Sequence, residues 1–310
     1  MTRRGEALDA AAEKLPVLSL VGRPNVGKSS LVNVYLGQKI AIVSPKPQTT
    51  RQTQLGILTR PEVQIIFVDT PGMHTPRNAL GQFMVETAAR TLQDVDALLF
   101  IVDVSVPPGP SDTLLAQTIA EKAADKPLVL ALNKSDLLKP EDVVAHTAAY
   151  RALVPESTPW MLVSATRGDN LDELLAFVIQ ALPEGPALYP EDEVTQTNLR
   201  DLAGELVREA ALNALEQEVP HGLAVEVEEF QERLTGPTYI AAAVYVERES
   251  HKPIVIGKAG RMLKQIGSAA RLEIEKMLEK PVYLELHVKV RKDWRRDEGA
   301  VRRMGYKDKD

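Results

Sequence analysis

The residues best suited to chemistry lie near the start of the chain, in the segment GRPNVGKS at positions 22–29. Two glycines separated by four residues precede Lys28 and Ser29, which is the phosphate-loop pattern. Its glycines let backbone N–H groups curl around phosphate oxygens, and the following helix adds its positive N-terminal end. Lys28 can reach the outer phosphates, and the Ser29 hydroxyl can bind Mg²⁺. We assign this run to a nucleotide site: Gly22, Arg23, Pro24, Asn25, Val26, Gly27, Lys28, Ser29 and Ser30.

Two further segments offer groups for a metal ion and a γ-phosphate. DTPG at 69–72 ends an apolar run, where Asp69 can hold the Mg²⁺ shell and the Gly72 amide can reach the γ-phosphate. The polar loop 44–53 contains two adjacent threonines, and one of them can complete the Mg²⁺ shell when γ-phosphate is present. Such a loop would act as a switch. The nucleotide-site residues predicted in the first segment are Asp69, Thr70, Pro71, Gly72 and Met73.

Two more segments are suited to a guanine base. In NKSD (133–136), Asp136 offers two acceptors for the N1–H and 2-amino donors of guanine, a donor pair that adenine lacks. Asn133 and Lys134 would brace the base, and the Ala165 amide in SAT (164–166) can meet the guanine oxygen. Each segment alone reads as a turn or a helix cap, but their order after successive apolar runs favours a GTP site. The predicted residues are Asn133, Lys134, Ser135, Asp136, Ser164, Ala165 and Thr166.

The elements that position these residues alternate between strand and helix. Short, continuous runs rich in Val, Ile and Leu predict strands covered on both faces, at 17–22, 63–69, 97–104, 127–133 and 160–165. Helical patterns lie at 28–36, 111–124, 141–150 and 171–182, and segment 54–59 predicts an antiparallel edge strand. The alternation predicts an α/β fold with a doubly wound, largely parallel sheet. Together with the phosphate loop, it resembles the fold of Ras-like P-loop NTPases.

A second, smaller α+β domain follows a proline-rich stretch at 182–194. The pattern there predicts a helix at 198–216, strands at 222–230 and 238–249, a helical turn at 253–256, a helix at 261–279 and a strand at 282–290. The expected divisions are a leader (1–14), a GTP-binding domain (15–182), a linker (183–196) and the second domain with a basic tail (197–310).

Composition narrows the function classes. The 310 residues include no cysteine, which excludes disulfides and thiolate metal sites. No apolar run reaches the roughly 18 residues of a membrane span, so we expect no transmembrane segment. Residues 248–310 hold 17 Lys and Arg against 10 Asp and Glu, whereas the other 247 residues hold 20 against 33. A basic end on an acidic body suggests that only this end meets a polyanion, although a solvated basic tail explains the charge equally well.

A second glycine-bearing loop lies in this basic end, Gly257-Lys258-Ala259-Gly260. It has no hydroxyl residue after its lysine to bind Mg²⁺, but close backbone approach, positive charge and a following helix suit a nucleic-acid backbone. From the loop alone a plain turn between helices is the commoner explanation. The predicted RNA-binding residues are Ile256, Gly257, Lys258, Ala259, Gly260, Arg261 and Lys264.

Apolar and aromatic side chains around this loop suggest further roles. We expect Ile254, Ile256, Leu263 and Ile266 to floor a groove for unstacked bases. Trp294 either stacks on a base or, as is more common, packs the tail onto its domain. None of the five histidines has metal-ligand spacing.

The five nucleotide segments resemble the signatures of translation-factor-type GTPases. PIVIGKAGRMLKQIG, the run VYLELHVKVRKDWR and the terminal MGY resemble the Era family of bacterial GTPases. The resemblance implies a type II KH domain that binds the 3′ region of small-subunit (16S) ribosomal RNA. It further implies GTP hydrolysis to GDP and phosphate, as a GTP-timed switch in the assembly and maturation of the 30S ribosomal subunit.

The resemblance also assigns roles within the nucleotide site. Thr50 occupies the place of the switch threonine, and Asn25 matches a loop asparagine that K⁺-stimulated relatives use, so the expected cofactors are GTP/GDP, Mg²⁺ and K⁺. Met73 stands where Ras-like GTPases have a water-orienting glutamine, and a thioether cannot orient water in that way. The expected catalytic residues are Asn25, Lys28, Thr50 and Gly72, and the expected metal ligands are Ser29, Thr50 and Asp69.

Two other functions stay open at this point. One is a membrane-linked GTPase whose basic tail touches anionic lipid, which places it peripherally at the cytoplasmic face of the cell membrane. The other is an RNA-binding module with a purely structural nucleotide site. The expected partners are 16S ribosomal RNA and the 30S subunit, in the cytoplasm.

Overall fold

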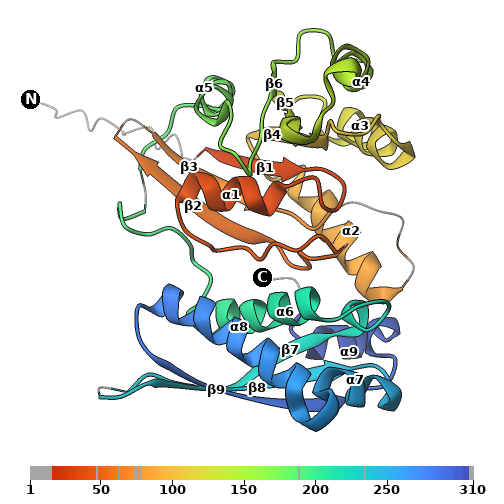
Figure 1. The fold of residues 1–310 in the computed structure, drawn as a ribbon. Helices are drawn as coiled ribbons and strands as arrows, with labels where there is room; N and C mark the ends of the chain where they lie inside the picture. The colour runs from red at the N-terminus through yellow and green to blue at the C-terminus, as the bar shows by residue number, and fades with distance from the viewer. Residues whose placement is uncertain are drawn as a thin grey trace, which may run out of the picture.

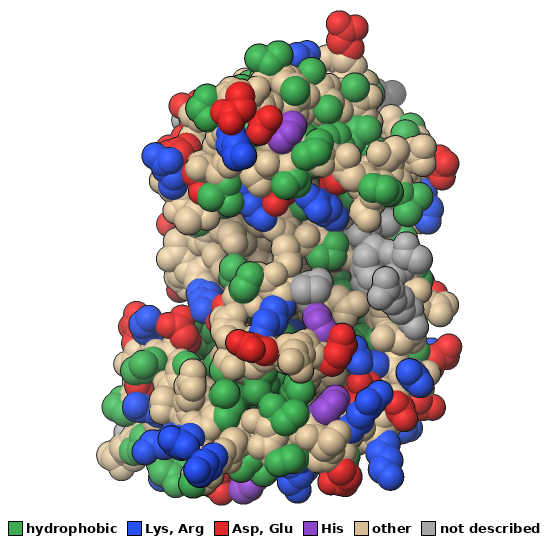
Figure 2. Space-filling model, turned by 45° about the vertical axis from the view of Figure 1, so that its right-hand side comes forward, with side chains coloured by type: hydrophobic (Ala, Val, Ile, Leu, Met, Phe, Trp, Pro, Cys, Tyr) green, Lys and Arg blue, Asp and Glu red, His purple; other side chains and the backbone are tan. Residues whose placement is uncertain are grey.

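The computed structural model describes residues 16–46, 48–61, 63–72, 76, 78–187, 189–233 and 235–306. The expected leader (1–14) and Met73 lie outside these residues. The chain forms an upper and a lower lobe, each built on its own sheet (Figure 1). In the space-filling view of Figure 2 the two lobes meet across a narrower middle band.

The first lobe contains a six-stranded sheet in the order β2-β3-β1-β4-β5-β6. Only β2 runs antiparallel, against β3, and the other neighbours are parallel. The doubly wound sheet and its antiparallel edge strand are therefore confirmed. The elements in chain order are β1 (Val17–Val21), α1 (Lys28–Leu36), β2 (Gln54–Arg60), β3 (Val63–Asp69), α2 (Ala79–Thr91), β4 (Ala97–Asp103), α3 (Pro110–Lys122), β5 (Leu128–Asn133), α4 (Val143–Arg151), β6 (Trp160–Leu162) and α5 (Leu171–Ala181).

The strands read as continuous apolar runs because a core lies on each face of this sheet. Helices α1 and α5 close one face, where Leu31 and Leu174 are buried against the strands. Helices α3 and α4 close the other, where Ile119 and Tyr150 are buried. Because β1, β3 and β5 run in the same direction, their carboxyl ends lie at one edge of the sheet.

Helix α2 was not predicted from the sequence. Its buried side chains Leu80, Met84 and Ala88 recur every four residues, and the Asn78 side chain caps its start by accepting from the Gly81 amide at 2.8 Å. The periodic signal was present but is short and interrupted by a glycine.

The second lobe contains a three-stranded sheet in the order β7-β8-β9, with β7 antiparallel and β9 parallel to β8. Helices α6 and α8 cover one face of this sheet (Figure 1). A short helix after β9 stands where only a basic tail was expected. The elements are α6 (Leu199–Ala214), β7 (Ala224–Gln231), β8 (Thr238–Val246), α7 (Lys252–Ile256), α8 (Arg261–Leu278), β9 (Val282–Val290) and α9 (Glu298–Arg303).

The proline-rich stretch between the lobes lies along the edge strand β2. The Ile57 amide donates to the Val194 carbonyl at 2.8 Å, and the Thr195 hydroxyl donates to the Leu55 carbonyl at 2.6 Å. These bonds cover part of an edge that would otherwise leave backbone groups unpaired, and they fasten the connection to the first lobe.

Candidate functional site

A cavity of about 330 Å³ opens at the carboxyl edge of the first sheet. Its walls come from all five predicted segments: the phosphate loop, the loop around Thr49 and Thr50, Gly72, the Asn133–Leu137 segment and the Ala165–Thr166 pair. These segments are up to 142 residues apart in the sequence (Pro24 to Thr166), and strand order brings them to one place.

The phosphate loop is held in its curled form by Asn133. Gly27 has a φ of +104°, and a Cβ at this position would lie 2.2 Å from the Asn133 side-chain nitrogen, so only glycine fits. That nitrogen donates to the Val26 carbonyl at 2.7 Å, while the Asn133 side-chain oxygen accepts from the Ala165 amide at 3.0 Å. Asn133 therefore ties the phosphate loop to the SAT segment, and the Ala165 amide is engaged with this side chain.

The Lys28 ammonium lies inside the loop, with the residue only 6% exposed. It donates to the Gly22 and Arg23 carbonyls at 3.0 and 3.1 Å. Burial lowers the pKa of Lys28 to about 8, and the Asp69 charge opposes this shift. The ammonium is thus positioned at the centre of the loop, where phosphate oxygens would meet it.

The three residues predicted to bind a metal ion lie together. The Ser29 hydroxyl donates to Asp69 Oδ2 at 2.6 Å and lies 2.9 Å from Thr50 Oγ1. Burial raises the pKa of Asp69 to about 6, against the opposing effects of Lys28 and the hydrogen bonds from Ser29 and Thr50. Two hydroxyls and one carboxylate are the hard oxygen donors that Mg²⁺ prefers, with phosphate oxygens and water as further ligands.

One oxygen of the Asp69 carboxylate has no hydrogen-bond partner within the residues that the structure describes, which fits a bound cation. Asp69 Oδ1 is buried and has no hydrogen-bond partner among the described residues, a costly state for a carboxylate oxygen. A positive ion beside it would remove that cost. Over the same part of the chain, no cluster of three His, Cys, Asp or Glu side chains forms a separate metal site.

Gly72 lies directly against the phosphate loop. A Cβ at Gly72 would stand 2.6 Å from the Pro24 nitrogen and 2.7 Å from the Pro24 Cα. Any larger residue would push the backbone away from the loop, so the absence of a side chain keeps the Gly72 amide close to the cavity.

Beside the base end of the cavity lies Asp103, a residue that the sequence interpretation missed and that contacts the cavity residue Lys134. Lys134 donates to Asp103 Oδ2 at 2.7 Å, and Asp103 is the last residue of β4. The Ser164 hydroxyl donates to Asp136 Oδ1 at 2.6 Å. The position of Asp103 at the carboxyl end of a buried strand was a signal that could have identified it.

The phosphate loop has two more contacts that fix its outer side. The Arg23 guanidinium lies 3.2 Å from Asp112, a buried carboxylate that also accepts from the Gly109 amide at 2.9 Å. Asn25 adopts a φ of +64°, and its side-chain nitrogen donates to the Pro45 carbonyl at 2.6 Å. Asn25 therefore connects the phosphate loop to the loop that contains Thr50.

The second glycine loop precedes the start of α8. Gly257 and Gly260 have φ values of +72° and +75°, and a Cβ at Gly257 would stand 2.6 Å from the Met262 Cβ. At Gly260 the same position is open space. The side chains of Lys258, Arg261 and Lys264 are exposed around this turn, while Ile256 is partly buried. The loop thus presents backbone and positive charge at the amino end of a long helix.

Two expectations around this loop are now decided. Ile266 is completely buried in the core of the second lobe, so the expectation that it floors an open groove is wrong. Trp294 is likewise 0% exposed, and its Nε1 donates to the Gly222 carbonyl at 2.9 Å. A buried indole with its one donor satisfied packs the tail onto the domain and does not stack on a base.

Comparisons with known proteins agree with this architecture. A family model described as 50S ribosome-binding GTPase matches residues 17–134, and one described as KH domain matches residues 218–295. The GTPase Era of Halothermothrix orenii is 47% identical over 290 residues, covering 94% of this chain and 97% of the relative. The GTPase Era of Geobacter metallireducens is 46% identical over 292 residues, covering 93% and 96%.

A solved structure of Era in complex with MgGDPNP and nucleotides 1506–1542 of 16S ribosomal RNA has a TM-score of 0.88 to this chain. Its sequence is 42% identical, and the match covers 94% of this chain and 99% of that one. Both domains match along nearly the full length of each protein. The chain belongs to the Era family of GTPases, with a P-loop GTPase domain followed by a KH domain.

Proposed function

We propose that this chain hydrolyses GTP to GDP and phosphate and binds the 3′ region of 16S ribosomal RNA through its KH domain. The nucleotide state would then time a step in the assembly and maturation of the 30S subunit. The observation that carries the nucleotide half is the convergence of Ser29, Thr50 and Asp69 beside Lys28. Family membership supports GTP hydrolysis, and the related complex with 16S nucleotides supports the RNA half.

Each nucleotide-site residue has a role in this proposal. Ser29, Thr50 and Asp69 would hold Mg²⁺, which supplies positive charge to the phosphate oxygens when bound. Asp136 would accept from guanine, with Asn133 and Lys134 beside the base. The GTP-binding domain would span 15–182, the linker 183–196 and the KH domain 197–310.

Hydrolysis would proceed by in-line attack of water on the γ-phosphate. Lys28 and the loop amides would stabilise the developing negative charge, and the Gly72 amide would bind a γ-phosphate oxygen. The residue after Gly72 is methionine, so no glutamine orients water from that position. We therefore expect slow unaided turnover, as suits a timed switch.

Asn25 would bind K⁺ near the phosphates. Its side-chain nitrogen is used by the Pro45 carbonyl, which leaves the amide oxygen as the ligand atom. Turnover should be faster in KCl than in NaCl of equal concentration, and Asn25→Ala should remove that difference. Equal turnover of the unaltered chain in both salts would exclude a role for K⁺.

The KH domain would bind RNA at the second glycine loop. Gly257 and Gly260 let a ribose-phosphate backbone approach, and exposed cations add attraction that depends on salt. The residues proposed to contact RNA are Ile256, Gly257, Lys258, Ala259, Gly260, Arg261 and Lys264.

A direct experiment measures GTP turnover of the full chain and its binding to a single-stranded RNA with the sequence of 16S nucleotides 1506–1542. The matched competitor is an equally long fragment of 23S ribosomal RNA, because the family model over residues 17–134 carries a large-subunit description. We expect tighter binding to the 16S sequence. Equal affinity for both RNAs would contradict the small-subunit assignment, and absence of turnover would contradict the enzymatic one.

Attachment to a membrane surface is less well supported. No helix among the described residues is long and apolar enough to span a bilayer. The C-terminal cations are partly paired within the domain: Arg295 with Glu247, and Arg303 with Asp297 at 3.6 Å. Sedimentation of the full chain with phosphatidylserine vesicles tests this alternative. Vesicle binding that persists in a variant whose RNA binding is strongly weakened, such as Gly260→Asp, would support it.

A further inference from the structure

The segment around Thr50 is fastened to the KH domain on both sides of Thr50. The Thr49 carbonyl accepts from the buried Arg208 of α6, Arg51 enters the KH domain, and Gln52 donates to the Gly305 carbonyl at 2.7 Å. Thr50, between them, points the other way, toward Ser29 and Asp69. One peptide unit therefore separates a proposed metal ligand from an anchor in the RNA-binding domain.

The Arg51 residue is only 2% exposed. It donates to the Leu223 carbonyl, to the His221 carbonyl at 3.0 Å and to the Tyr306 hydroxyl at 3.2 Å. In the described part of the chain no carboxylate forms an ion pair with it. A buried cation with only neutral acceptors depends on all of them, because leaving any one costs the desolvation of charge.

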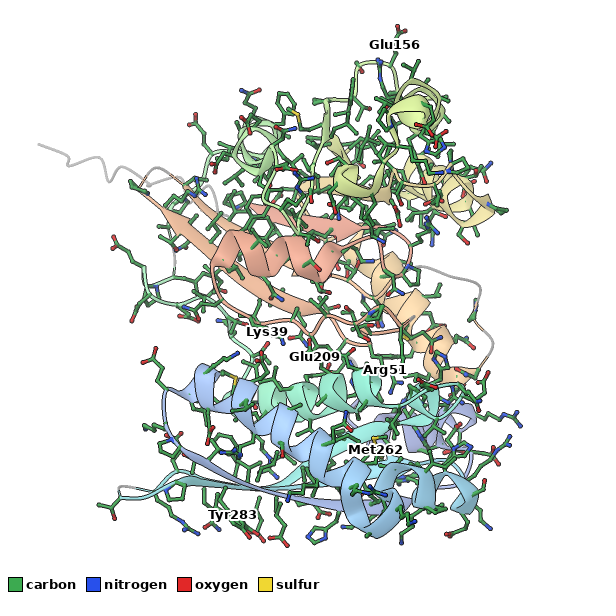
Figure 3. The ribbon with its side chains drawn as sticks, viewed as in Figure 1. Lys39, Arg51, Glu156, Glu209, Met262 and Tyr283 are labelled. Carbon is green, nitrogen blue, oxygen red and sulfur yellow. The ribbon has the colours of Figure 1, made fainter. Side chains whose placement is uncertain are left out.

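Part of the anchor comes from the C-terminal tail, residues 294–306. The Tyr306 and Trp294 rings stack at a centroid separation of 5.6 Å, and the Arg51 guanidinium lies 5.8 and 5.9 Å from the Trp294 and Tyr306 centroids. Figure 3 shows Arg51 at the boundary between the two lobes. The planar guanidinium thus gains ring contacts as well as hydrogen bonds, which a lysine could not reproduce.

The same tail also contacts α2, the helix that follows Gly72 in the chain. Leu80 and Met84 of α2 are buried in one cluster with Trp294 and Tyr306. Phe83 of α2 lies 6.5 Å from Tyr306, centroid to centroid. The loop around Thr50 and helix α2, which follows Gly72 in the chain, therefore both contact one aromatic pair near the C-terminus.

We infer that Arg51 is a positioning residue that couples the nucleotide site to the KH domain through the C-terminal tail. Docking of its guanidinium on Tyr306 and the His221–Leu223 carbonyls holds Thr50 beside Ser29 and Asp69. GTP with Mg²⁺ would favour the docked state, and the docked tail would in turn favour GTP over GDP. The inference rests on the proposed function, because Thr50 reports the nucleotide only if the cavity binds GTP with Mg²⁺.

Coupling between two sites is reciprocal, so it can be measured from either one. The experiment uses the full chain with Mg²⁺ and determines the dissociation constants of GDPNP and GDP, each with and without the RNA of 16S nucleotides 1506–1542. The coupling ratio is the factor by which RNA changes the GDPNP-to-GDP preference, and typical couplings are about 5- to 150-fold.

Arg51→Gln should bring this ratio close to one, while GDP affinity without RNA changes by less than about threefold, under 1 kcal/mol. Arg51→Lys should not restore the ratio, because a lysine keeps the charge but lacks the planar fork. Tyr306→Phe, which keeps the ring and removes one acceptor, should lower the ratio without changing the packing. The double variant Arg51→Gln/Tyr306→Phe should have the same coupling ratio as Arg51→Gln alone, because both changes remove the same interaction.

The matched control is Arg200→Gln. Arg200 also donates to two backbone carbonyls, those of Val227 and Glu228, but both belong to its own domain, so the control should keep the full ratio. Retention of the ratio in Arg51→Gln and Tyr306→Phe would overturn the inference and leave the proposed function intact. An unaltered chain that binds both GDPNP and the RNA but shows no RNA effect on GDPNP binding would also overturn the inference alone. Failure to bind GDPNP or the RNA would instead contradict the proposed function. If Arg51→Gln does not fold, Tyr306→Phe decides the matter.

Discussion

The Ser164 hydroxyl donates a 2.6 Å hydrogen bond to the Asp136 carboxylate. Ser164 is itself completely buried and comes from the segment after β6, whereas Asp136 follows β5. The bond therefore orients the carboxylate at the end of the cavity through a neighbouring strand.

Asp136→Asn should shift nucleotide preference from guanosine toward xanthosine triphosphate. The new amide would oppose the N1–H of guanine with a donor, and an unmatched buried donor costs about 1–3 kcal/mol, or about 5- to 150-fold in affinity. Competition between GTP and XTP for the full chain measures the change. Ser164→Ala, which only releases the carboxylate, should weaken both nucleotides and keep GTP preferred. Undiminished GTP selectivity in Asp136→Asn would refute the role of Asp136.

Gly260→Asp should weaken RNA binding by about tenfold or more without altering nucleotide affinity measured in the absence of RNA. A Cβ at Gly260 would meet no atom within 4 Å, so the variant adds a negative charge to the loop without a steric clash at its Cβ. The control is Gly260→Asn, because asparagine tolerates positive φ and adds no charge. Filter binding at low salt should show a loss of about tenfold or more for Asp, equal to at least ~1.4 kcal/mol. Similar losses of RNA affinity in Gly260→Asp and Gly260→Asn would show that the shape of the loop, and not the added charge, controls RNA binding.

Lys258→Gln and Lys264→Gln should each reduce the salt dependence of RNA binding. Removing one contact to a single-stranded phosphate lowers the slope of log affinity against log salt by about 0.7. The comparison variant is Lys280→Gln, an exposed lysine that pairs with Glu232 beyond α8, which should leave the slope unchanged. A slope that is identical in all four proteins would place the phosphate contacts elsewhere.

Trp294→Phe should lower stability and leave RNA affinity without nucleotide nearly unchanged. The substitution orphans the buried Gly222 carbonyl, at a cost of about 1–3 kcal/mol in the free energy of unfolding. Urea unfolding provides the free energy, and gel-shift titration provides the RNA affinity. A variant of full stability that no longer binds RNA would mean that the indole touches RNA after all.

Acid should destabilise the fold partly through His221. Burial lowers its pKa below 6.5; Glu218 opposes the shift, and Arg295, Arg51 and Lys46 add to it. The unfolded chain therefore binds a proton in a pH range where the folded chain does not, and stability falls as pH drops through 6.5.

His221→Asn should make the free energy of unfolding less dependent on pH between 7 and the lowered pKa of His221. Denaturant unfolding across this range measures the effect. His287→Asn serves as the comparison, because His287 is exposed on β9, and it should retain the acid sensitivity of the unaltered chain. Equal pH dependence in the unaltered chain and His221→Asn would exclude His221 as a source of it.

Local patterns in the sequence determined the strands, most of the helices and the segments that reach the cavity. Phosphate loops, NKSD-type segments and glycine loops consist of neighbouring residues on one turn, so spacing alone identifies them. Their meeting at one edge follows from the rule that parallel strands end on the same side. The positions of Ser29, Asp69 and Asp136 at this edge were predictable for that reason, because each lies within such a segment.

Only the tertiary structure decided how the two domains meet. Arg51 is an arginine in a polar loop, which ordinarily predicts an exposed side chain, yet it is buried against residues more than 160 positions away. The sequence left Trp294 ambiguous and placed Ile266 wrongly, because an apolar side chain near a basic loop can face either RNA or core. Asp103 pairs with Lys134 across two strands. Such contacts depend on packing between segments that are distant in the sequence. The residue pattern within one helix or strand does not indicate which distant segment that element will contact.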